Sequence, residues 1–423
     1  MTSDADAVGP LVENLFRSQA GLLTARLARA FGPGGLADAE EVTQAALLKA
    51  LAVWPFRGVP DNPEGWLWRV ARNMALDRLR SRRFLAPVAP EEIADALPAD
   101  PVEAPGFRAE LEDDRLRLIF ACCHPMLSAE ARLALTLKTV CGLGTAEISA
   151  AFLVPEPTLA QRLVRAKARL AEARVPFAIP GPDALPERLA SVLEVVYLTF
   201  NEGYEAARGD ALIRRDLARE AVRLARLLAA HPVAGRPESR ALAALLHLQA
   251  ARLPARADAA GDLILLPEQD RTLWDRRLLA EGFHWLRTSM AGDRETRWHL
   301  EAAIAAAHAQ APRWADTDWP HILALYDRLV VLHPSPVVAL NRAVALAEIA
   351  GAEAGLAALE SLRDEPALAR YPLFAAARAE MNRRLGRRAA AVDQLRAALG
   401  LELSEPMRRL LERRLLELAP GGG

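Results

Sequence analysis

Lysine, cysteine and aromatic residues are scarce in this chain of 423 residues. Lysine occurs at three positions, so arginine supplies nearly all of the positive charge. The three cysteines, two of them adjacent, do not indicate a disulfide framework. No apolar run reaches the roughly 18 residues of a membrane-spanning helix, and the N-terminus carries no basic-then-apolar signal. We therefore expect a cytoplasmic protein without a membrane segment.

Signatures of metal and catalytic sites are also missing. The sequence contains no phosphate-binding glycine loop, no nucleophile elbow and no cluster of metal ligands. The run Cys122-Cys123-His124 comes closest to a zinc site, but structural zinc needs four ligands, and neighbouring side chains on a helix point about 100° apart. Packing is the simpler explanation for these cysteines. We expect no metal and no cofactor.

Helix-forming residues are what the sequence contains most. Ala, Leu and Arg dominate, apolar residues make up 52% and charged residues 25%, as in a soluble globular protein. Segments that alternate in Val, Ile or Thr are absent, and residues 262–266 (DLILL) form the one short run that resembles a strand. The length favours two to four domains. We predict an all-α protein.

Charge is unevenly distributed, although the net charge is only −1. Residues 69–83 hold six arginines and one aspartate, whereas residues 91–114 hold nine acidic residues and one arginine. Local patches, rather than the sum, decide which partners a protein attracts. The basic segment is therefore a candidate nucleic-acid surface.

Proline-rich stretches divide the chain into sections. We predict a first helical module, an acidic proline-rich linker, a second helical module, a helical extension and a repeat-like region, at residues 10–84, 85–108, 109–176, 177–319 and 320–423. The last region contains two segments that each consist of a helix, a glycine and a second helix. Gly351 and Gly386 are 35 residues apart, close to the roughly 34-residue tetratricopeptide period. Because alanine-rich helices resemble one another, a generic helical bundle is the alternative.

In the first module, the residues from Pro63 onward predict an amphipathic helix. At about 100° per residue its basic face collects a set of arginines with an asparagine and a tryptophan at the border: Arg69, Arg72, Arg80, Arg83, Asn73 and Trp66. Such arginines can neutralise backbone phosphates, and an aromatic ring there can stack on an unpaired base. Trp66 borders this face more closely than Trp68. The alternative is a solvated basic face over two core tryptophans.

The second module predicts a helix-turn-helix. Ser128 is a plausible N-cap of one helix, and Thr145 of the next. After a turn at Pro155, a third helix begins near Glu156. In it Leu159, Leu163, Ala166 and Leu170 form an apolar stripe, and Arg162, Arg165 and Arg169 lie beside that stripe. A basic helix after a tight turn suits the major groove of DNA, although an ordinary three-helix core with surface arginines is the alternative.

Both modules resemble regions of bacterial sigma factors. The run DAEEVTQAALLKAL (38–51), followed by residues 54–83, resembles sigma region 2, and residues 127–170 resemble sigma region 4. Their order, joined by a linker without the intervening region 3, is typical of group IV (extracytoplasmic-function) sigma factors. Residues 180–420 resemble the extension of the sigma subgroup that carries C-terminal tetratricopeptide repeats.

The resemblance implies roles for particular residues. Core RNA polymerase would be bound through its β′ clamp coiled coil and β flap, the former by the helix that carries Asp38, Glu41 and Gln44. The loop 57–63 would hold a flipped −10 base, and the melted strand would follow Trp66, Arg69, Arg72, Asn73 and Arg80. The −35 element of promoter DNA would contact Thr158, Gln161, Arg162, Arg165, Lys167 and Arg169. Pro157 stands where many relatives have Gly or Ala, which affects where the recognition helix starts.

The extension has no legible chemistry of its own. The resemblance implies a built-in regulatory or interaction module, with a protein partner or ligand. Glu202 and Tyr204 could suggest an acid–base site, but Gly203 between them indicates a helix end. Two other functions stay open: an autonomous helix-turn-helix regulator that binds duplex DNA without polymerase, and, less favoured, an enzyme with its site around Glu202.

Overall fold

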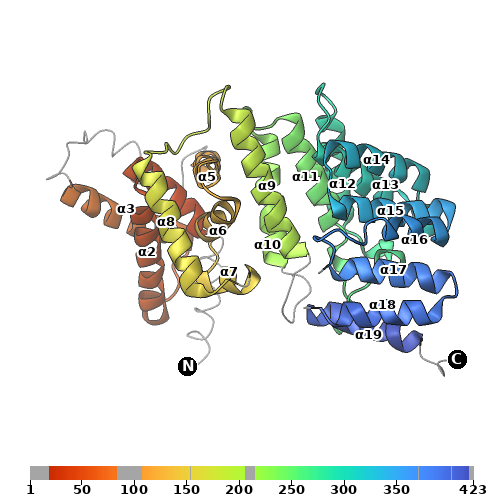
Figure 1. Ribbon diagram of the computed structural model, residues 1–423. Helices are drawn as coiled ribbons and strands as arrows, with labels where there is room; N and C mark the ends of the chain where they lie inside the picture. Colours follow the sequence, from red (N-terminus) through yellow and green to blue (C-terminus); the bar gives the residue numbers. More distant parts are fainter. Residues whose placement is uncertain are drawn as a thin grey trace. The chain divides into compact units, whose positions relative to one another are not determined.

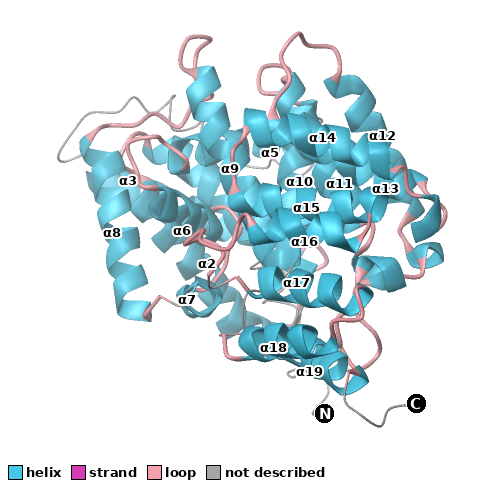
Figure 2. Ribbon diagram, turned by 45° about the vertical axis from the view of Figure 1, so that its right-hand side comes forward, coloured by secondary structure: helices cyan, strands magenta, loops and turns pink. Residues whose placement is uncertain are grey.

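The computed structural model describes residues 19–82, 97, 107–152, 154–204, 215–369, 371–401 and 403–418. Within these ranges the regular elements are all helices, as Figure 2 shows, which confirms the predicted all-α fold. Among the helices of these ranges, none combines the length and apolarity that crossing a bilayer requires.

Residues 262–266, which resemble a strand in the sequence, do not form one in the structure. They contribute one isolated β-bridge, between Ala257 and Leu263, and a 3-10 helix follows at once, Leu266–Glu268. The chain reverses at Gly261, whose φ of 81° favours glycine, so the pairing ends after two backbone hydrogen bonds. A segment that folds back on itself so tightly cannot extend into a sheet.

Two compact units divide the chain, Met1–Thr199 and Phe200–Gly423, here called the N-terminal and C-terminal units (Figure 1). The division falls inside helix α9 (Leu185–Tyr204). In the N-terminal unit, residues 19–31 are helical. The helices that follow there are α2 (Leu36–Arg57), α3 (Pro63–Arg82), α5 (Phe107–Cys122), α6 (Ala129–Thr139), α7 (Thr145–Phe152) and α8 (Glu156–Glu172).

The two predicted modules pack together within the N-terminal unit. Arg26, in the first module, lies 2.6 Å from the Asp114 carboxylate on α5, and both side chains are buried. Arg29 and Arg117 bind the same carboxylate. Gly21 allows the backbones to meet, because a Cβ there would lie 2.1 Å from the Val140 carbonyl oxygen. One buried carboxylate therefore joins helices that are far apart in the sequence.

The C-terminal unit is a succession of helices in which neighbours along the chain pack on one another (Figure 1). Its α-helices are α10 (Arg215–Ala230), α11 (Pro237–Ala250), α12 (Arg276–Ser289), α13 (Arg297–Gln310), α14 (Trp319–Leu332), α15 (Pro336–Ala350), α16 (Ala352–Glu360), α17 (Pro372–Arg384), α18 (Arg388–Leu399) and α19 (Glu405–Glu417). Three further 3-10 helices, η1 (Leu253–Ala255), η3 (Arg271–Leu273) and η4 (Trp314–Asp316), lie in the connections. α11 contacts α10, α12 and α13.

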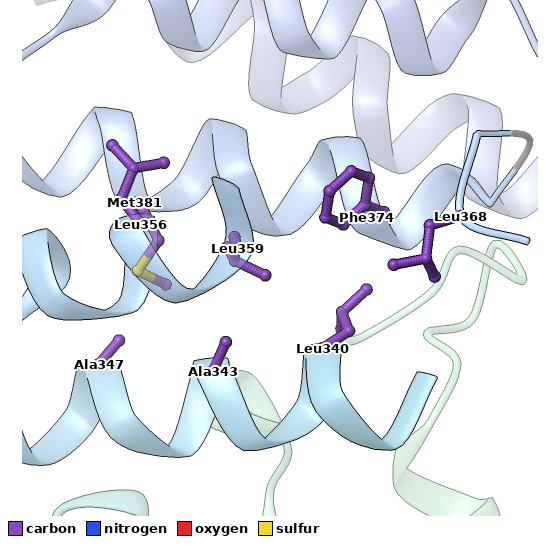
Figure 3. Packing of buried hydrophobic residues seen from close by; sticks show 8 residues of the cluster. All are labelled: Leu340, Ala343, Ala347, Leu356, Leu359, Leu368, Phe374 and Met381. Atoms are coloured by element: carbon purple, nitrogen blue, oxygen red, sulfur yellow. The ribbon is translucent and has the colours of Figure 1, made fainter. Parts of the chain in front are cut away.

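Both predicted helix–glycine–helix segments form helical hairpins, α15 with α16 and α17 with α18. Gly351 and Gly386 make the turns with φ of 87° and 72°. Small residues on α15, Ala343 and Ala347, face the larger side chains of α16 and α17 in Figure 3. Leu359 is fully buried in this cluster. The hairpin geometry agrees with a tetratricopeptide-like arrangement, whose assignment to that family stays a prediction.

Candidate nucleic-acid interface

Helix α3 separates an apolar side from a basic side. Its first turn is capped by Asn62, whose side-chain oxygen accepts the Gly65 N–H at 2.9 Å. Leu67 and Trp68 are buried, at 1% and 3% exposure. Trp66 is half-exposed, with its ring edge-on to that of Trp54 at 5.4 Å between centroids. Of the two tryptophans, Trp66 is thus the one that borders the basic face.

The predicted DNA contacts of α3 differ in their exposure and in their bonding partners. Arg69 and Asn73 are exposed. Arg80 is exposed too and pairs with Asp77 at 3.2 Å, an arrangement on the surface that contributes little to stability. Arg72 is half-buried, and its Nε donates to the Leu97 carbonyl at 2.8 Å.

The acidic helix α2 places its three predicted polymerase contacts differently. Asp38 is buried and, with the exposed Glu41, binds Arg78 of α3 at 2.8 and 2.7 Å. The Arg78 hydrogen bond lowers the pKa of Glu41 and so keeps that carboxylate charged. Gln44 is exposed, and so is Leu48, at 64%, one turn further along the same side. The sequence analysis did not predict Leu48 as a surface residue of this side, although its spacing of four residues from Gln44 places it there.

The helix-turn-helix has the predicted elements with one change. Ser128 caps α6, because its side chain accepts the Ala131 N–H at 3.3 Å. The N-cap of α7 is Gly144 rather than Thr145: its carbonyl accepts the first helical hydrogen bond, and its N–H donates to Glu147 at 2.6 Å. The side chain of Glu147 closes this turn from the helix, so no hydroxyl is needed at the cap.

Helix α8 shows the clearest separation of a buried side from an exposed polar side. It starts at Glu156, and the predicted stripe of Leu159, Leu163, Ala166 and Leu170 is confirmed as its buried side. Thr158, Gln161, Arg165 and Arg169 are exposed, whereas Arg162 is half-buried. Arg165 donates to Gln161 one turn earlier at 3.2 Å. These exposed side chains form a polar and basic row on a helix whose other side is fixed by the core.

The cysteines of the second module lie in the core. Cys122, Cys123 and Cys141 are free and buried. Cys123 Sγ is 3.4 Å from Thr136 Oγ1, and burial raises the pKa of this thiol to about 11. Within the described residues, no group of three or more His, Cys, Asp or Glu side chains is arranged to hold a metal ion. The packing interpretation accounts for all three positions.

Three segments of the chain match protein families. Residues 15–84 match sigma-70 region 2, residues 117–170 match sigma-70 region 4, and residues 188–290 match a family of unknown function (DUF6596). ECF RNA polymerase sigma factor SigE of Mycolicibacterium smegmatis is 32% identical over 141 residues, which cover 32% of this chain and 52% of that protein. Sigma-70 regions 2 and 4, together with this relative, support an extracytoplasmic-function (ECF) type of sigma factor.

A second relative is similar to this chain over a longer stretch. An uncharacterized protein of Rhizobium meliloti (strain 1021), R00370, is 42% identical over 355 residues, which cover 82% of each chain. No solved structure is significantly similar to this sigma factor. Because 355 residues exceed the length of either unit, the match includes parts of both units.

One predicted DNA contact of the sigma factor is engaged inside the N-terminal unit. Lys167 Nζ lies 2.6 Å from Glu40 on α2, and the two side chains are 22% and 13% exposed. Glu40 also accepts from Thr139 of α6 at 2.7 Å. Lys167 therefore faces α2, apart from the exposed row of α8. In this conformation Glu40 ties regions 2 and 4 together.

Proposed function

We propose that this sigma factor binds core RNA polymerase and directs it to promoters whose −35 element is read by α8 and whose −10 element is read by α3. The observation that carries the proposal is the exposed row of α8, which stands on a buried apolar stripe in the region 4 match. A helix held in this way can enter the major groove without rearranging its own core.

At the −35 element, Arg165 is the proposed base reader. Its exposed guanidinium can donate two parallel hydrogen bonds to a guanine edge, and Gln161 can pair with an adenine edge. Arg162, beside the row, and Arg169, at its C-terminal end, would contact phosphates and so set the register without reading sequence.

At the −10 element, the exposed Arg69 and Asn73 would follow the melted strand, and Trp66 would stack on one of its bases. Arg72 and Lys167 would join the DNA only after exchanging their present partners, the Leu97 carbonyl and Glu40. Promoter binding would then be coupled to opening of the Lys167–Glu40 contact between regions 2 and 4.

On the polymerase side, Glu41 and Gln44 with the exposed Leu48 would meet the β′ clamp coiled coil. Region 4 would bind the β flap. Asp38 would act indirectly, since its ion pair with Arg78 holds α2 on α3.

The test is run-off transcription with purified core polymerase and the full-length protein. We expect Arg165→Ala to weaken −35-dependent initiation by about 1–3 kcal/mol on the intact promoter. On a promoter with a scrambled −35 element the same variant should lose almost nothing, which is the matched control. Equal losses on both promoters would refute base reading by Arg165.

The autonomous-regulator alternative predicts a different result. A gel shift on the same promoter, with and without core polymerase, separates the two functions. We expect specific binding only with core polymerase, because the sigma interpretation assigns duplex affinity to the holoenzyme. Sequence-specific binding by the protein alone would favour the alternative.

A further inference from the structure

Helix α10 in the C-terminal unit carries arginines along one side. Leu217, Ala221, Leu224 and Leu228 bury the opposite side. The arginines at positions 215, 219, 223 and 226 recur every three or four residues, so they project in one direction over three turns. Helix α10 is thus amphipathic, and its polar side carries four arginines beside two carboxylates, Asp216 and Glu220.

These arginines line a groove, although Arg215, Arg219 and Arg226 are also exposed to solvent. Its volume is about 510 Å³, and its other walls come from α11, η1 and α12. Gly282 sets the distance between α11 and α12, because a Cβ there would lie 2.7 Å from the Leu248 side chain. The close approach brings His247 of α11 within 3.2 Å of Glu281 on α12 at the groove wall.

The carboxylates that line the groove are already engaged. Asp275 caps α12 by accepting the N–H groups of Arg277 and Leu278 at 2.9 and 3.1 Å. Glu281 lies beside His247 and 3.7 Å from Arg277. Neither carboxylate neutralises the row on α10.

Three of the arginines on α10 have no acidic partner in the part of the chain that the structure describes. Among the described residues, no carboxylate forms an ion pair with Arg215, Arg219 or Arg226, whereas Arg223 binds Glu220. Burial lowers the pKa of the neighbouring His247, and Arg226 adds to this against the Ala243 carbonyl and Glu281, so His247 adds no positive charge to the groove near neutral pH. Uncompensated guanidinium groups around a concavity favour an anion.

We propose that this groove binds a small metabolite that carries two or more phosphate or carboxylate groups. Its volume lies within the roughly 300–1,000 Å³ range of small-molecule sites and is too small for a duplex. Arg219 and Arg226 are seven residues, or about 10 Å, apart along the helix, so one compact anionic group cannot satisfy both. Apolar wall residues, Val222, Leu253 and Leu278, would contact the uncharged body of the ligand.

The groove lies in the segment that matches the family of unknown function, residues 188–290. The inference does not depend on promoter recognition, because every residue that carries it belongs to the C-terminal unit. A ligand there would give the sigma factor a sensor for a cytoplasmic anion on its own chain.

The experiment is isothermal titration calorimetry of the full-length protein with phosphate, pyrophosphate and tripolyphosphate at matched ionic strength. We expect saturable one-to-one binding that tightens in that order, as more arginines are bridged. Arg219→Ala and Arg226→Ala should each weaken tripolyphosphate binding about tenfold, since each removes charge-assisted hydrogen bonds. Arg219→Lys should fall between, because lysine keeps the charge and loses the fork.

Arg276→Ala is the matched control. Arg276 is exposed, begins α12 next to Arg277 and does not line the groove. Far-ultraviolet circular dichroism confirms folding, which an exposed arginine-to-alanine change on a helix should not disturb. The proposal is overturned if none of the three probes binds saturably, or if Arg276→Ala weakens binding as much as Arg219→Ala. It is also overturned if an acidic peptide or DNA binds to the protein and Arg219→Ala weakens that binding, while none of the three probes binds.

Discussion

Helices α8 and α10 have nearly the same sequence pattern and very different surroundings. Each buries a stripe of leucine and alanine and carries arginines beside it. On α8 the side chains of Arg165 and Arg169 are exposed and do not line the pocket that Val164, Lys167 and Ala168 border. On α10 the arginines form one wall of a groove closed by α11 and α12. The neighbours, not the helix itself, decide whether a basic side is convex or concave.

Shape then decides the class of ligand. A convex basic helix can enter the major groove of a duplex, which supplies the concave surface. A concave basic wall excludes the duplex and accepts a molecule small enough to be surrounded. The same arginine chemistry would therefore serve promoter reading in one unit and metabolite binding in the other.

The largest expected effect is on the stability of the N-terminal unit, which holds α8 in place. Asp114→Ala should lower the free energy of unfolding of the N-terminal unit by about 3–5 kcal/mol, because it leaves Arg26 buried without its counter-charge. Urea unfolding followed by tryptophan fluorescence measures it. Asp77→Ala, which removes an exposed pair with Arg80, should cost less than about 0.5 kcal/mol. Equal losses would mean that Asp114 does not join the two regions.

A crossed pair of variants tests the comparison itself. Arg165→Ala should reduce −35-dependent initiation by about 1–3 kcal/mol and leave tripolyphosphate binding unchanged. Arg219→Ala should do the reverse, with promoter affinity unchanged in the absence of polyanion. Quantitative run-off transcription and calorimetry on the same preparations give both readouts. If either variant impaired both activities, the division of labour between α8 and α10 would be wrong.

The C-terminal unit should also respond to acid through His308. Burial, and then Arg252 and Arg271, lower the pKa of His308 to about 3, and its ring lies among Trp314 and Trp319. In the unfolded chain it titrates near 6.5. Below pH 6.5 the unfolded state binds a proton that the folded state refuses, so stability falls by about 1.4 kcal/mol per pH unit.

The measurement is urea unfolding of the C-terminal unit between pH 7 and 5, where most carboxylates stay ionised. His308→Gln should flatten the dependence in this window, whatever it does to stability at pH 7. A slope that the substitution leaves unchanged would show that other groups, such as His247 and His299, whose pKa values burial also lowers, dominate the response.

Local periodicity accounts for what the sequence could predict. The buried stripe of α8 and the orientation of Trp66 follow from 3.6 residues per turn, which needs no tertiary information. Gly203 is a position that helical periodicity explains only in part. The sequence predicts a helix end at Gly203, and α9 is described as far as Tyr204, one residue later; a Cβ at Gly203 would also lie 2.3 Å from the Ala218 backbone nitrogen. This close approach comes from a neighbouring helix, and no local pattern reveals that.

The groove escaped prediction for the same reason. The arginines of α10 are visible in the sequence, but the opposite wall at Arg277 and Glu281 comes more than 50 residues after them. Lys167 is a second instance. The sequence groups it with the predicted DNA contacts of α8, and only its partner Glu40, 127 residues earlier, shows that it faces α2. Contacts of such separation are set by packing, which one sequence does not display.

The smallest expected effect concerns the Lys167–Glu40 ion pair, which lies on the side of α8 that faces α2. Glu40→Gln should lower the stability of the N-terminal unit by less than about 1 kcal/mol, since glutamine still accepts from Thr139. Lys167 would then be free for a phosphate, so promoter binding by the holoenzyme should tighten a few-fold and its salt dependence steepen by about one ion. Lys167→Ala is the matched control, because it also breaks the pair but removes the cation. Filter binding over a range of salt concentrations separates them: opposite shifts support a Lys167 that is restrained by Glu40, and identical shifts contradict it.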